Sequence, residues 1–212
     1  MKRETWMDRI TNESNLWLNA IKMEDEGSFL EASFLYLKDA AESLQQNSLV
    51  KAALSCSCAS KCLSMTGNLE ASRQLYLQTA MLYEINGDTV IGESVREALW
   101  SYQECYEYYN LVCNSEKAQI IHDKYVSLVR RTNPFLGEEE AMQSMRQRRK
   151  TSEVIKSDIN QTDMQVSTQV ANAMESVLKA VESIYAKMNL EQSNSEQRNQ
   201  SRVKKFEKSL TS

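Results

Sequence analysis

Three cysteines within seven residues form the densest group of side chains in this sequence that could do chemistry. Cys56, Cys58 and Cys62 lie in the run SCSCASKC, and Cys105 and Cys113 follow. A structural zinc site needs four thiolate or imidazole ligands that converge tetrahedrally. On a helix Cys56 and Cys58 point about 160° apart, and no second cysteine pair has matching spacing. We therefore expect small, buried core residues here, with no metal and no cofactor.

The single histidine, His122, is the sole imidazole available to activate a nucleophile. Its neighbours Lys117, Asp123 and Lys124 favour a position on a charged helix surface. The sequence contains no Gly-rich phosphate loop, no HExxH motif and no calcium-loop pattern. The acidic runs at 24–26 and 138–140 are typical of solvated helix ends. We expect no enzymatic activity.

The elements that must position these side chains are helices. Only one proline and five glycines occur among 212 residues, so long helices are favoured and tight β-turns are scarce. No apolar run approaches the roughly 20 residues that cross a bilayer, and residues 1–14 lack the apolar block of a secretory signal. Five cysteines form an odd set, which favours reduced thiols. We expect an all-α, cytoplasmic protein.

Helical periodicity and chain breaks divide residues 1–133 into three helical hairpins, at about 12–46, 48–86 and 90–131. Gly27 and Gly67 mark the turns within the first two hairpins, and Asn86-Gly87-Asp88 is predicted to end the second. Equal units of about 40 residues are typical of a solenoid, because one hairpin cannot bury both of its faces. The sequence therefore predicts an antiparallel helical-hairpin solenoid.

The predicted helix at 48–65 has two apolar stripes. Ala52, Cys56 and Ala59 fall on one side with Leu63, whereas Leu54, Cys58 and Met65 fall nearly opposite. A surface helix carries a single apolar stripe. Two stripes therefore indicate a helix that is packed on both sides, inside a stack.

The pattern Gly27-x-Phe29-x-x-Ala32-x-x-x-Tyr36 resembles the turn and second helix of a tetratricopeptide repeat (TPR), and the stretch 67–80 repeats it. Units longer than 34 residues are more similar to the TPR-like solenoids of the soluble NSF attachment protein (SNAP) group. The resemblance covers roughly residues 12–131. The second helix of the third unit lacks the signature, which favours a capping element. The resemblance implies an adaptor that binds other proteins.

In such an adaptor the first helix of each hairpin would line a groove that grips a peptide or helix of a partner. Residues 1–144 carry 13 basic and 21 acidic side chains, a net charge of −8, which favours basic partners. Aromatic side chains off the core stripes are typical partner anchors. The predicted partner-binding residues are Trp17, Lys51, Arg96, Trp100 and Tyr108.

The chain changes character after Pro134. We predict a basic linker or short helix at 134–151, an amphipathic coiled-coil-like helix at 152–189 and a disordered tail at 190–212. The helix would place its apolar stripe against a second copy in a homodimer, against the solenoid or against a partner helix. That stripe comprises Val166, Val170, Ala173, Val177, Ala180 and Ile184.

Two alternative functions belong to this second half. A coiled-coil oligomeric structural protein would use the heptad stripe for self-association. A nucleic-acid-associated regulator would use the basic patch Arg146, Arg148, Arg149 and Lys150 to hold phosphates. Four charges with no interleaved aromatic residue form a small patch, so the sequence disfavours a nucleic-acid partner.

Overall fold

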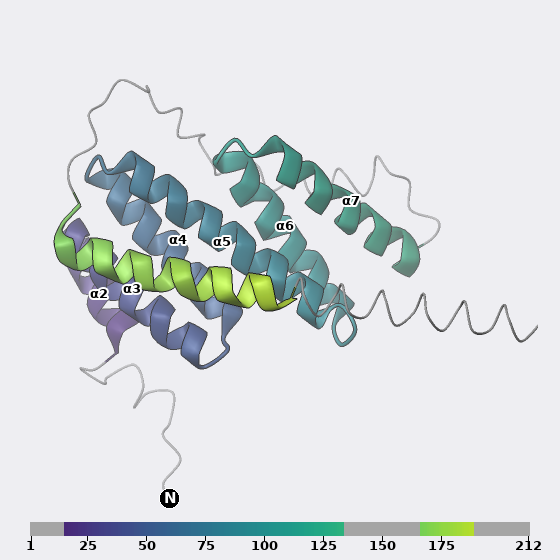
Figure 1. Cartoon of the computed structure of the whole chain (residues 1–212), viewed down its shortest axis with the longest axis horizontal. Helices are drawn as coiled ribbons and strands as arrows, with labels where there is room; N and C mark the ends of the chain where they lie inside the picture. Colours follow the sequence, from purple (N-terminus) through teal and green to yellow (C-terminus); the bar gives the residue numbers. More distant parts are fainter. Residues whose placement is uncertain (1–14, 134–165, 189–212) are drawn as a thin grey trace, which may run out of the picture.

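The computed structural model describes residues 15–133 and 166–188. All regular structure in these two ranges is helical, which confirms the predicted all-α class. Residues 168–188 form a further helix after the six labelled in Figure 1. Among the described residues no helix is both long and apolar enough to span a membrane. The six labelled helices are α2 (Leu16–Asp25), α3 (Phe29–Gln45), α4 (Leu49–Met65), α5 (Leu69–Val90), α6 (Val95–Leu111) and α7 (Ser115–Thr132).

Helices that follow one another in the sequence pack side by side (Figure 1). Three residues join most of them, for example 26–28 between α2 and α3, so the chain reverses direction at each connection. The main interhelical contacts are α2 with α3, α3 with α4, and so on to α6 with α7. The six labelled helices therefore form a row in which each packs on the next.

Four of the connections share one turn geometry. Gly27, Asn47, Gly67 and Cys113 have φ angles of 78°, 56°, 80° and 59°. At the first turn the N–H of Ser28 donates to the carbonyl of Met23 at 2.8 Å, and the same six-residue bond recurs at the other three. This is the Schellman arrangement, in which a left-handed residue ends a helix. The helix ends predicted at Gly27 and Gly67 are confirmed.

The turn predicted at Asn86-Gly87-Asp88 is wrong, because α5 continues through it to Val90. A Cβ built on Gly87 would lie 2.6 Å from Cε1 of Tyr102, so this glycine admits the α6 ring against the α5 backbone. Asn86 donates from Nδ2 to Ser101 Oγ at 2.9 Å, which ties the same two helices. The residues that favour a turn by type serve here in helix packing. The second hairpin thus ends about four residues later than predicted.

Small side chains fill the core around α4. Ala52, Ala53, Cys56 and Ala59 are all fully buried. The predicted second stripe is wrong, since Leu54 and Met65 are 43% and 61% exposed. The second packed side is formed instead by residues beside the first stripe, so α4 buries one wide arc rather than two opposite faces. The cysteines Cys56, Cys62 and Cys105 are buried, Cys58 is half-buried and Cys113 is exposed.

The helix at 168–188 lies against the labelled helices and shares their core (Figure 1). Of the predicted stripe, Val170 and Val177 are buried, at 2% and 0% exposure. The other four members are half-buried, and the buried set also includes Met174 and Val181, which the heptad reading missed. The stripe is covered by its own chain. The 134–151 linker with Arg146, Arg148, Arg149 and Lys150, the start of the 152–189 helix and the 190–212 tail lie outside the described residues.

Candidate functional site

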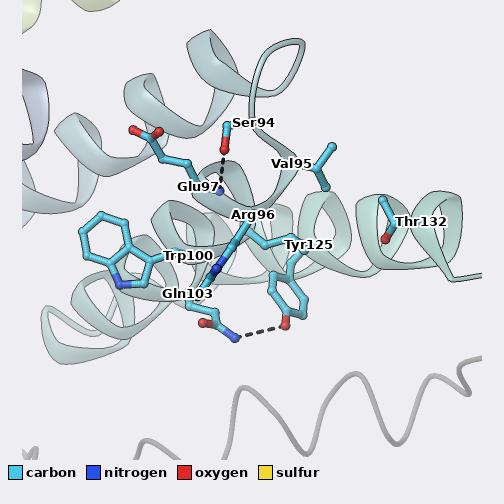
Figure 2. A pocket seen from close by; sticks show the side chains of 9 residues that line it. Ser94, Val95, Arg96, Glu97, Trp100, Gln103, Tyr125 and Thr132 are labelled. Carbon is cyan, nitrogen blue, oxygen red and sulfur yellow. Dashed lines mark hydrogen bonds between the residues drawn. The ribbon is translucent and has the colours of Figure 1, made fainter.

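A pocket of about 770 Å³ opens between α6 and α7 (Figure 2). Gln103 donates from Nε2 to the hydroxyl of Tyr125 at 3.0 Å, and this bond joins the two helices. The Trp100 ring packs edge-on against Tyr83 of α5, with ring centroids 5.4 Å apart. This contact with α5 restricts the orientation of the indole. The pocket is lined by Ser94, Val95, Arg96, Glu97, Leu99, Trp100, Gln103, Tyr125 and Thr132.

The lining combines apolar and polar groups in the way that binding sites do. Val95, Leu99 and Trp100 supply an apolar surface, and exposed Arg96 supplies a guanidinium that can pair with a carboxylate or a backbone carbonyl. Glu97 is the only carboxylate among the lining residues, and no imidazole or thiol accompanies it. The lining of the pocket is thus an apolar surface beside one guanidinium and one carboxylate.

Arg96 and Trp100 are the two predicted partner-binding residues that the structure brings together. Tyr108 lies elsewhere on α6, stacked on Tyr83 and Tyr76 with centroids 5.9 and 5.8 Å away. Its hydroxyl shares a hydrogen bond of 2.7 Å with Ser57 of α4. Burial raises the pKa of Tyr108 to about 12, so this phenol stays protonated. Tyr108 contributes mainly to the contact between α4, α5 and α6.

Trp17 and Lys51 also make contacts within the chain. The half-buried Trp17 packs edge-on against Tyr36, with ring centroids 5.1 Å apart. Lys51 pairs with Asp39 of α3 at 2.8 Å, and that carboxylate also accepts a hydrogen bond of 2.6 Å from Ser55. Because Asp39 is almost fully buried, its charge needs these partners. Lys51 keeps an exposed side and neutralises a core carboxylate with its ammonium.

A charged cluster that sequence reasoning missed joins α5, α6 and α7. Lys124 of α7 contacts Glu84 at 3.0 Å and Asp88 at 2.8 Å, both on α5. Tyr109 donates to Glu84 at 2.8 Å, and Tyr102 donates to Asp88 at 2.7 Å. Burial lowers the pKa of Lys124, but its bonds to the two carboxylates outweigh burial, and the net pKa is raised. The available signal was Glu84 itself, an acid within the apolar run AMLYEI.

His122 and the cysteines of α4 lie mostly inside the helical packing. The His122 side chain is only 12% exposed, more buried than its charged neighbours suggested, and contacts Asp123 at 3.2 Å. Burial raises the pKa of Cys56 and of Cys62 to about 12 and that of Cys58 to about 11, which keeps the thiols protonated. Within the described ranges no three His, Cys, Asp or Glu side chains gather as a metal site would require.

No family model, curated protein or solved structure matches the chain. The resemblance to tetratricopeptide repeats and SNAP-type solenoids therefore rests on the sequence pattern, and the function is inferred from the geometry described above.

Proposed function

We propose that residues 15–133 form a TPR-like, SNAP-like solenoid of three helical hairpins that acts as a non-enzymatic adaptor in the cytoplasm. Regular spacing supports the solenoid: α3, α4 and α5 begin at Phe29, Leu49 and Leu69, twenty residues apart. Among the six labelled helices, the main contacts join sequence neighbours only. Both features are expected of stacked repeats, in which each unit touches the next.

Corresponding positions of the first two hairpins also hold similar side chains. Ala40 of α3 and Ala80 of α5, forty residues apart, are both fully buried. Tyr36 and Tyr76 are both buried, at 1% and 9% exposure, at the same point of their helices. Similar burial at positions forty residues apart supports the proposal that the stretches around Gly27–Tyr36 and 67–80 are two copies of one internal repeat.

The observation that carries the adaptor proposal is the pocket between α6 and α7. An apolar side chain of the partner would enter the pocket and pack against Trp100 and Leu99. Arg96 would pair with a carboxylate or carbonyl of the same partner. Ile21 of α2 and Leu54 of α4 are further exposed apolar side chains on the first helices of their hairpins. The ligand is accordingly a peptide or helix of another protein, with one bulky apolar anchor.

Site-specific photo-crosslinking tests this function. A photoreactive residue placed at Gln103 in the full chain should capture a protein from an extract of the source organism. Adding Trp100→Ala should reduce that capture about tenfold, as loss of an interface anchor does. The matched control carries the photoreactive residue at exposed Glu31 on α3. Equal capture from both positions, or capture that Trp100→Ala leaves unchanged, would refute recognition through the pocket.

A further inference from the structure

Helix 168–188 is a packed element that is joined to the hairpins only through a long connection. α7 ends at Thr132, so 35 residues, 133–167, lie between it and this helix. Figure 1 shows the helix lying across the row of labelled helices. The helix is thus distant in the chain from the elements on which it packs, whereas each labelled helix follows its neighbour after three or four residues.

The helix meets the hairpins through one narrow stripe. Val170, Met174, Val177 and Val181 recur at steps of four, three and four residues and are at most 7% exposed. The opposite face, which includes Ala171, Glu175 and Lys179, is exposed. The contact is therefore that of an amphipathic helix on an apolar surface, which is the helix-in-groove mode of recognition.

One polar contact fixes the end of this helix. Lys117, in the first turn of α7, donates from Nζ to the hydroxyl of Tyr185 at 2.9 Å. The ammonium also lies 5.4 Å from the centroid of the Tyr185 ring, within reach of a cation–π interaction. Because Tyr185 follows Val181 by four residues, the hydroxyl that Lys117 contacts continues the buried stripe of the helix.

We propose that the surface beneath helix 168–188 is a docking site for an amphipathic helix of a partner protein, which displaces the chain's own helix. The structure shows what such a ligand needs: aliphatic side chains at i, i+4, i+7 and i+11, and a tyrosine at i+15 for Lys117. Lys117 lies outside the lining of the pocket between α6 and α7, so this site does not rest on the proposed function of that pocket.

Helix 168–188 competes with a partner helix for the same surface. It therefore lowers the apparent affinity for the partner, because the surface is open only part of the time. Unseating the helix by substitution should remove that competition. The unseated variant is the full chain with Val177→Asp and Val181→Asp. Its affinity for a fluorescent peptide of residues 166–188 should be about tenfold or more above that of wild type. The control, Ala171→Asp with Ala186→Asp on the exposed face, should bind the peptide as wild type does.

Further measurements complete the test. Adding Lys117→Ala to the unseated variant should weaken peptide binding, whereas adding Trp100→Ala should not, which separates this site from the pocket. In the wild-type chain, amide hydrogens of 168–188 should exchange faster than those of α4 and α5. Exchange at the same rate, or no gain in peptide affinity in the unseated variant, would overturn the proposal. A dimer that Val177→Asp splits into monomers would overturn it too, because the occupant would then be a second copy.

Discussion

The residue whose role differs most from its type is Gly87. Asn-Gly-Asp is a strong turn signal, yet here all three residues continue α5 and face neighbouring helices. The glycine lacks the side chain that would meet Tyr102, the asparagine bonds to Ser101, and Asp88 accepts from Tyr102. Residue type alone could not distinguish these two uses, because the difference lies in a ring that approaches from fifteen positions further along the chain.

Substitution of this glycine gives a direct check of the close helix approach. Gly87→Ala should lower the free energy of unfolding by about 1–3 kcal/mol, because the new Cβ would lie 2.6 Å from the Tyr102 ring. The control is Gly92→Ala, where a Cβ meets nothing within 4 Å. Urea unfolding followed by circular dichroism measures both. Equal stability of the two variants would mean that α5 and α6 do not approach this closely.

At the scale of elements, the two turns that contain Gly27 and Gly67 were the easiest part of the fold to predict from sequence. Gly27 and Gly67 predicted their turns correctly, because the left-handed backbone conformation at the end of a helix favours a residue without a side chain. Asn47 and Cys113 adopt the same conformation with side chains, and this gave a weaker signal. Periodicity placed the helices but not their ends, since α5 gains its last residues from contacts with α6 and α7.

The same contrast applies to the candidate site. Arg96 and Trp100 were predicted as partner-binding residues from their type and their place on a first helix; both line one pocket, and their role in binding stays a prediction. The pairing of Lys51 with Asp39, and the stacking of Tyr108 on Tyr83, depend on which helix lies beside which. A single sequence does not give that information.

Substitutions at the residues with positive φ should change the free energy of unfolding by amounts that depend on the residue replaced. Cys113→Gly should raise the free energy of unfolding by about 1 kcal/mol, because it relieves a side chain at a φ of 59°. Asn47→Gly should give a smaller gain, since asparagine tolerates this region. Gly67→Ala should instead lower stability by about 1 kcal/mol. Chemical denaturation of the three variants against wild type measures the order, and a loss of stability in Cys113→Gly would contradict it.

For the whole molecule, the buried phenols and thiols determine how the fold responds to alkali. Burial raises the pKa of Tyr36, Tyr83 and Tyr109 well above the ordinary phenol value, and that of Cys56 to about 12. These groups release protons more readily in the unfolded chain than in the folded one. Their contribution to stability is therefore complete below their unfolded pKa values, about 8.5 for cysteine and 10 for tyrosine, and is lost as the pH rises above them.

We expect the free energy of unfolding to fall steeply between about pH 9 and pH 11.5, by up to about 1.4 kcal/mol per buried group for each pH unit. Urea unfolding at a series of pH values measures this fall. Tyrosinate absorbance should rise together with the loss of helical circular dichroism. Tyr83→Phe should make the fall shallower, because it removes one buried phenol whose pKa burial raises. Tyrosinate formation near pH 10 with the helices intact would contradict this expectation.

The small side chains of α4 affect the shape of the row of helices. Because Ala52, Ala53, Cys56 and Ala59 are fully enclosed, α4 can accept no added bulk on its packed arc. A leucine at one of these places would push apart α3 and α5, the two helices that flank α4, and alter the angles at which they cross it. Through those angles, small enclosed side chains determine how strongly the row of helices bends.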